Sequence, residues 1–143
     1  MSEISQLDTL NHALDVGKTL PPQQKHDMDR YWQTQGHVLA HELMHTDWAS
    51  GAQGPSGRYG HNQHVKDLTI SSKDSKGTLK EGKAYRPHMA KILATWPQNT
   101  GDHTTRNANN FSLFITSQYV QEQLGGYPPW PIAGEEPTRP PYA

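Results

Sequence analysis

The segment His41-Glu42-Leu43-Met44-His45 constrains the fold of this chain more than any other part of its sequence. It matches the pattern H-E-x-x-H, in which two histidines stand four residues apart. Side chains with this spacing lie on one face of an α-helix, so both imidazoles can reach a single metal ion. Residues 31–40 contain no proline, which is consistent with a helix that runs into the motif. The pattern therefore predicts a helix that carries a metal site.

The residue between the two histidines gives this site a possible chemistry. Glu42 could reach a water molecule on the metal, and zinc lowers the pKa of such a water from about 15.7 to near 7. We therefore expect one Zn²⁺ per chain, held by His41 and His45, with Glu42 as the general base for attack on a peptide carbonyl. Because nine of the 143 residues are histidine, a chance motif in an ordinary helical protein is a further alternative.

Composition excludes several other classes of protein. The net charge is −1 and no run of like charges occurs, so we expect no nucleic-acid partner. No stretch is apolar enough to span a membrane, and the polar N-terminus shows no signal peptide. The chain has no cysteine, which excludes disulfides and Cys-ligated zinc. The length indicates one domain, which we expect to be a monomer.

The spacing of apolar residues predicts a mainly α fold of α+β, zincin-like type. The predicted elements are helices over 3–16, 29–48, 85–96 and 109–124, and a short strand or hairpin that begins with 65–70. Glycine and proline together make up 23 residues, so we expect long loops. The expected organisation is an N-terminal helix and linker over 1–28, a catalytic domain over 29–128 and a Pro-rich, extended tail over 129–143. The motif helix should pack on the two later helices.

Three stretches of the sequence, taken in order, resemble a known family. The first is the motif itself, the second is Ala84-Tyr85-Arg86-Pro87 followed by 90–94, and the third is Asn107-Ala108-Asn109-Asn110-Phe111 followed by Phe114. Together they resemble the aspzincin metalloendopeptidases, the deuterolysin and lysine-specific metalloendopeptidase group, and look closest to related secreted peptidases of filamentous fungi. The resemblance covers roughly residues 30–128. It implies a zinc metalloendopeptidase that is extracellular and acts on a peptide or protein substrate.

The chain also departs from the pattern of that family. The family has Gly-Thr-x-x-Asp-x-x-Tyr-Gly, whereas here Gly77-Thr78 and Tyr85 are further apart. Arg86 stands where glycine is usual, and Asn109 stands where aspartate is usual. These departures keep a second function open, in which a catalytically degenerate zincin-like domain acts as a binding or structural module.

A catalytic zinc has three protein ligands and one open position, so a third ligand must follow the motif. The candidates are Asp67, Glu81, His61 and His64. Asp67 is preferred because it begins a short apolar stretch after the glycine-rich loop. Glu81 lies four residues before Tyr85, close to the position of the family aspartate. Asp47 is on another helical face from His45 and is expected to be an outer-shell or capping group.

Other residues have roles that the sequence leaves open. Tyr85 resembles the aspzincin tyrosine, which would donate a hydrogen bond to the developing oxyanion, and the alternative is a tyrosine packed at a helix start. Asn107 and Asn109 could orient ligands, although helix capping is the preferred interpretation. His37 is expected to face solvent. The tryptophans are interpreted as core or cleft-wall residues: Trp32, Trp48, Trp96 and Trp130.

Overall fold

The computed structural model of the chain describes residues 4–51, 64–74, 76–95, 102–126 and 136–142. It is mainly helical with a small antiparallel sheet, which confirms the prediction of a mainly α fold with a short hairpin. The helices are α1 (Leu10–Lys18), α2 (Pro22–Lys25), α3 (Gln35–Met44), α4 (Asp47–Ser50), α5 (Pro87–Thr95), α6 (Asp102–Arg106) and α7 (Ala108–Leu124). Two short 3-10 helices are η1 (Ile4–Gln6) and η2 (Met28–Arg30), and the strands are β1 (Thr69–Lys73), β2 (Leu79–Lys83) and β3 (Glu136–Tyr142). None of the described helices is long and apolar enough to cross a membrane.

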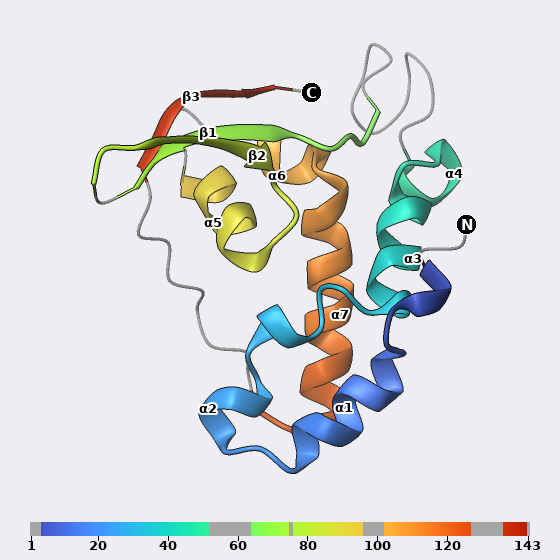
Figure 1. Cartoon of the computed structure of the whole chain (residues 1–143). Helices are drawn as coiled ribbons and strands as arrows, with labels where there is room; N and C mark the ends of the chain where they lie inside the picture. Colours follow the sequence, from blue (N-terminus) through green and yellow to red (C-terminus); the bar gives the residue numbers. More distant parts are fainter. Residues whose placement is uncertain (1–3, 52–63, 75, 96–101, 127–135, 143) are drawn as a thin grey trace.

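The longest helix, α7, is the axis of the fold. Helix α3 packs along it, α1 and α2 lie at its C-terminal end, and the sheet and α5 lie at its N-terminal end (Figure 1). Helix α5 contacts the sheet and also α7. The predicted span of α7 agrees with the structure to within one residue. The helix ends before Gly125, whose φ of 68° suits a residue without a side chain.

The sheet has the order β2-β1-β3, with every pair antiparallel. Strands β1 and β2 form a hairpin in which Thr69 faces Lys83. The turn is held by Asp74, whose side chain accepts the backbone N–H groups of Lys76 and Thr78, each at 2.9 Å. Gly77 has a φ of 78°, which glycine adopts without strain. The predicted strand over 65–70 is displaced to 69–73, and its hairpin partner is the polar strand over 79–83.

The predicted helix over 29–48 is divided in the structure. Thr34 caps the N-terminus of α3 by accepting the N–H of His37, and Thr46 caps α4 in the same way from Ala49. Threonine hydroxyls satisfy the free N–H groups of a first helical turn, so each begins a new helix. Thr9 has the same role for α1, which begins at Leu10 and not at the predicted residue 3.

Three small apolar clusters hold these elements together, and one of them supports the site. Leu68, Ile70, Ala84, Ile92 and Leu93 pack the sheet on α5. Leu14, Met28, Tyr31 and Val120 join α1 and η2 to α7. Met44, Val65 and Ala108 join the end of α3, the segment before β1 and the start of α7. This last cluster brings residues 41–45 next to residues 65–67.

Candidate metal centre

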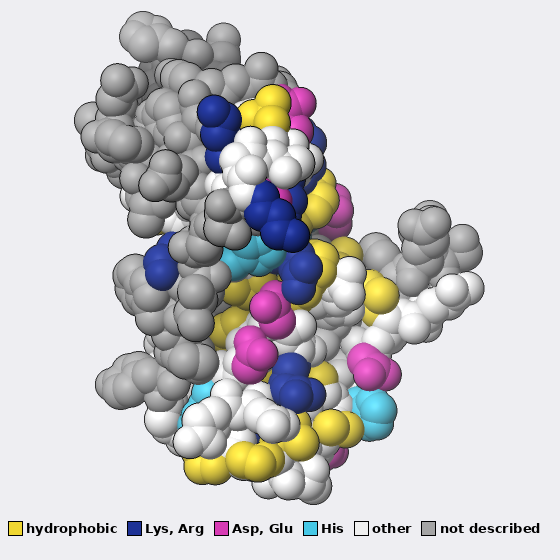
Figure 2. All heavy atoms as spheres, turned by 60° about the vertical axis from the view of Figure 1, so that its left-hand side comes forward, with side chains coloured by type: hydrophobic (Ala, Val, Ile, Leu, Met, Phe, Trp, Pro, Cys, Tyr) yellow, Lys and Arg dark blue, Asp and Glu magenta, His cyan; other side chains and the backbone are white. Residues whose placement is uncertain are grey.

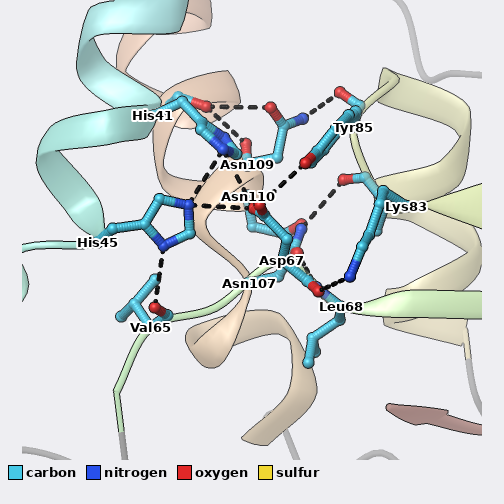
Figure 3. Close-up of polar contacts among 12 residues, drawn as sticks. His41, His45, Val65, Asp67, Leu68, Lys83, Tyr85, Asn107, Asn109 and Asn110 are labelled. Carbon is cyan, nitrogen blue, oxygen red and sulfur yellow. Dashed lines mark hydrogen bonds and ion pairs between the residues drawn. The ribbon is translucent and has the colours of Figure 1, made fainter. Parts of the chain in front are cut away.

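Two segments far apart in the sequence supply the polar groups of this centre. Helix α3 carries His41, and His45 is its C-terminal capping residue. The segment before β1 carries Asp67, and backbone hydrogen bonds on both sides of Lys66 fix that segment to the junction of α6 and α7. The side chains of His41, His45 and Asp67 converge (Figure 3).

Three atoms face one another at nearly equal distances. The Nε2 atoms of His41 and His45 are 3.2 Å apart, and each lies 3.1–3.2 Å from Oδ1 of Asp67. In a tetrahedral zinc site with bonds of about 2.0–2.1 Å, ligand atoms are about 3.3–3.4 Å apart. The group is therefore of the right size and composition to hold a metal ion.

Hydrogen bonding shows that this arrangement suits a cation. Nδ1 of His45 lies 3.1 Å from the carbonyl oxygen of Val65 and must donate to it, so in the neutral ring Nε2 keeps its lone pair. Oδ1 of Asp67 is buried and accepts no hydrogen bond from the described residues unless an imidazole carries a proton on Nε2. Electron-rich atoms this close repel one another without a proton or a metal ion between them.

The carboxylate of Asp67 is oriented by its neighbours. The hydroxyl of Tyr85 donates to Oδ2 at 2.9 Å, which leaves Oδ1 to face the two histidines. Burial acts to raise the pKa of Asp67, but the hydrogen bonds from His41 and Tyr85 and the nearby imidazoles outweigh it and hold the pKa below its usual value. Asp67 is therefore a carboxylate at neutral pH, as a metal ligand must be.

Tyr85 stays a neutral hydrogen-bond donor in this setting. Burial, the hydrogen bond and charge of Asp67, and the charge of Glu42 together raise the pKa of Tyr85 to about 12. Its ring also meets that of His41 edge to face, with centroids 5.3 Å apart. Glu42 is exposed and directly follows His41 on α3.

Asn107 holds the two segments that carry Asp67 and Tyr85. Its side-chain oxygen accepts the N–H of Leu68 at 3.1 Å, and its Nδ2 donates to the carbonyl of Ala84 at 3.1 Å. Although Asn107 stands at the N-cap position of α7, its side chain makes no capping bond within the described part of the chain. The expectation of simple capping is therefore wrong for this side chain.

A second polar group lies inside the α3–α7 interface. His37 is 2% exposed, with Nε2 at 2.9 Å from Oδ1 of Asn109 and Nδ1 at 3.0 Å from the hydroxyl of Thr116. The amide nitrogen of Asn109 donates to the main-chain carbonyl of Tyr85. His37 thus does not face solvent as expected, because α7 covers it. The sequence signal was its position one turn before His41, on the same face.

The other candidate ligands lie elsewhere. Glu81 accepts a hydrogen bond from the hydroxyl of Ser71 at 2.8 Å and lies outside the group of two histidines and Asp67. His64 is paired with Asp47 at 2.6 Å, also away from the centre. His61 falls outside the described residues. Trp48 is 81% exposed, so its interpretation as a core or cleft-wall residue is wrong.

Comparisons of this chain with protein-family models, with curated proteins and with solved structures give no match. The site must therefore be interpreted from its own geometry. Two imidazoles and one carboxylate around an open position form a donor set that zinc accepts in catalytic centres.

Proposed function

We propose that this chain is a zinc-dependent metalloendopeptidase that hydrolyses peptide bonds. The observation that carries the proposal is the triangle of His41 Nε2, His45 Nε2 and Asp67 Oδ1, with sides of 3.1–3.2 Å. An H-E-x-x-H helix supplies two of these atoms and places a carboxylate beside them. The resemblance to the aspzincin group, drawn from short sequence stretches, agrees with this assignment.

The residues around the centre have separate roles in the proposed reaction. A bound zinc ion would supply a Lewis acid and a water of lowered pKa. Glu42 accepts the proton of the attacking water and returns it to the leaving amine. Tyr85 orients Asp67, and its hydroxyl, neutral at any physiological pH, can donate to the developing oxyanion after it leaves Oδ2.

The same donor set also occurs in non-haem Fe²⁺ oxygenases, so the metal itself must be identified. The position of Glu42 favours zinc and hydrolysis. Glu42 is exposed on α3 directly after His41, which is the sequence position of the general base in an H-E-x-x-H helix. Elemental analysis of the purified chain separates zinc from iron.

Substitution of Glu42 tests the proposal. The variant Glu42→Gln should keep its zinc and lose about 10²–10⁴-fold in the rate of hydrolysis of labelled casein, because only the base is removed. Glu122→Gln changes an exposed glutamate of α7 and serves as the matched control. Equal rates for Glu42→Gln and the parent would refute the base assignment. A parent chain that holds zinc but cleaves nothing would instead support the non-catalytic binding module.

A further inference from the structure

An open pocket of about 570 Å³ lies beside the metal centre. Trp32 and Met89 contribute apolar wall, Lys83 and Arg86 contribute positive charge, and Tyr85 separates the pocket from the centre. The guanidinium of Arg86 lies over the ring of Trp32, 5.9 Å from its centroid. The pocket is therefore apolar within and cationic at its edge.

Two side chains connect this pocket to the proposed metal ligands. The hydroxyl of Tyr85 donates to Oδ2 of Asp67, and Nζ of Lys83 donates to the main-chain oxygen of Asp67 at 2.8 Å. An extended peptide has a side chain about every 3.3 Å. A peptide whose carbonyl lies at the metal centre could thus place a neighbouring side chain in the pocket.

The cationic side chains that line the pocket differ in whether a carboxylate lies close to them. Lys80 is 3.6 Å from Asp74, and Arg86 is 3.5 Å from Asp29, both as exposed pairs of small energetic value. Lys83 has no carboxylate partner in the described ranges, and two of its three N–H donors remain for a ligand. Figure 2 shows Lys and Arg side chains gathered on one face of the molecule, with histidine and acidic side chains among them.

Three cations and one carboxylate line the pocket, so its net charge stays positive. Glu81 accepts a hydrogen bond from Ser71 at 2.8 Å on the neighbouring strand, which holds it toward β1. An anionic ligand can therefore pair with Lys83 and with the guanidinium of Arg86, while its methylene groups lie against Trp32 and Met89.

We infer that the pocket binds an acidic side chain, aspartate or glutamate, of a peptide substrate. The inference deepens the proposed function and rests on it, because the peptide is a substrate only if the chain is a peptidase. Recognition needs a carboxylate for Lys83 and Arg86, together with a short aliphatic stem for Trp32. A peptide with the neutral amide in place of the carboxylate gives Lys83 no charged partner and binds less tightly.

A binding experiment tests this without requiring catalysis. The indole N–H of Trp32 reports on the pocket in a ¹⁵N–¹H correlation spectrum and is assigned from its loss in Trp32→Phe. The probes are acetylated, amidated pentapeptides of alanine with glutamate, glutamine or lysine at the centre. We expect the glutamate peptide to shift the Trp32 signal with a Kd about tenfold lower than the glutamine peptide. Metal-free protein, prepared with a chelator, should respond equally, because the pocket and not the metal binds the carboxylate.

Variants of the two cations complete the test. Lys83→Gln and Arg86→Gln should each raise the Kd of the glutamate peptide about tenfold, and Lys83→Arg should restore it. Lys73→Gln, an exposed lysine of β1 outside the pocket, should leave the Kd unchanged. Equal shifts for the glutamate and glutamine peptides, or no change in Lys83→Gln, would overturn the inference.

The inference and the proposed function fail in different ways. Cleavage of peptides by the zinc-loaded chain with no glutamate-dependent shift would remove the pocket assignment and leave the peptidase. A glutamate-dependent shift in a chain that neither binds zinc nor cleaves peptides would support the acidic-ligand pocket and remove the peptidase.

Discussion

Three histidines, one per turn, lie on the inner face of α3 and at its C-terminal cap. They occupy two regions, which differ in the hydrogen-bond partners of the ring nitrogens. His37 has a hydrogen-bond partner for each ring nitrogen, Asn109 on one side and Thr116 on the other. One and two turns later, His41 and His45 direct Nε2 at each other and at Asp67. Polar groups in a protein interior normally face partners of the opposite kind, so three metal-ligating atoms that face one another require a reason.

The difference indicates what each region is for. In the His37 region each ring nitrogen has a side-chain partner, and the hydroxyl of Ser112 also lies 3.2 Å from Nε2. Asn109 donates to the carbonyl of Tyr85, so its oxygen accepts from Nε2 of His37, and Nδ1 accepts from Thr116. This network joins α3, α7 and the Tyr85 segment. In the second region neutral imidazoles supply at most one proton, on Nε2 of His41, for three atoms that can each coordinate a metal ion.

The largest expected effect comes from removing the carboxylate of the second region. Asp67→Asn should lower zinc affinity by more than about 100-fold, the upper range for loss of a partner outside the ligand set. The matched control is Glu81→Gln, the runner-up ligand, which should bind zinc as the parent does because Glu81 lies outside the group. Competition with a zinc-sensitive dye measures both. A larger loss of zinc affinity in Glu81→Gln than in Asp67→Asn would make Glu81 the third ligand in place of Asp67.

Zinc should stabilise the folded chain through this same region. At a free zinc concentration of 100 times Kd, the free energy of unfolding should rise by about 2.7 kcal/mol, because only the folded chain brings the ligands together. Urea unfolding with and without zinc measures the change. His45→Ala should show no such gain, while His37→Gln should keep it. An equal gain in His45→Ala would place the zinc elsewhere.

Substitution of Tyr85 can separate its two proposed roles, which are to orient Asp67 and to stabilise the oxyanion. Tyr85→Phe removes the 2.9 Å bond to Oδ2 and should lower zinc affinity by about 10–100-fold. If the variant is then saturated with zinc, any remaining loss in kcat reports the oxyanion role. Tyr119→Phe, on exposed α7 surface, is the control. Unchanged zinc affinity in Tyr85→Phe would show that Asp67 does not need this donor.

The smallest expected effect is on the pH dependence of stability, and it comes from the His37 region. Burial lowers the pKa of His37 below 6.5, its bond to Asn109 opposes this, and the charge of His41 lowers it further. The unfolded chain therefore binds a proton more readily, so stability falls as the pH decreases from 6.5 toward the folded pKa. In metal-free His37→Gln this part of the pH dependence should be lost, as measured by urea unfolding between pH 7.5 and 5. An identical slope in parent and variant would contradict it.

Parts of this structure follow from local sequence and others do not. The span of α7 was predicted to within one residue, but its apolar residues do not define its buried face. Asn109, Ser112 and Thr116 are buried, whereas Phe114 and Ile115 are exposed. The start of α3 at Gln35 depends on one hydroxyl, that of Thr34, which a search for apolar periodicity does not detect. The short hairpin was predicted, but its strands begin later than expected because their outer face is polar, although Asp74 and Gly77 are a turn signal.

The residues of the site also fall into those that local sequence predicts and those that it does not. His41, Glu42 and His45 could be found because one helix fixes their spacing. Asp67 was preferred over Glu81 from its place ahead of an apolar stretch, and the structure brings Asp67 to the two histidines. The contacts of His37 with Asn109 and of Asn107 with Leu68 span 72 and 39 residues. No local pattern predicts such pairs, because packing of α7 on α3 and the sheet creates them.

The metal content of the purified chain tests the central claim most directly. Elemental analysis after reconstitution should find one zinc per chain, none in His45→Ala, and one in His64→Ala, whose histidine is paired with Asp47 away from the centre. No zinc in the parent, or a full equivalent in His45→Ala, would contradict the account and leave the H-E-x-x-H motif without a metal to hold.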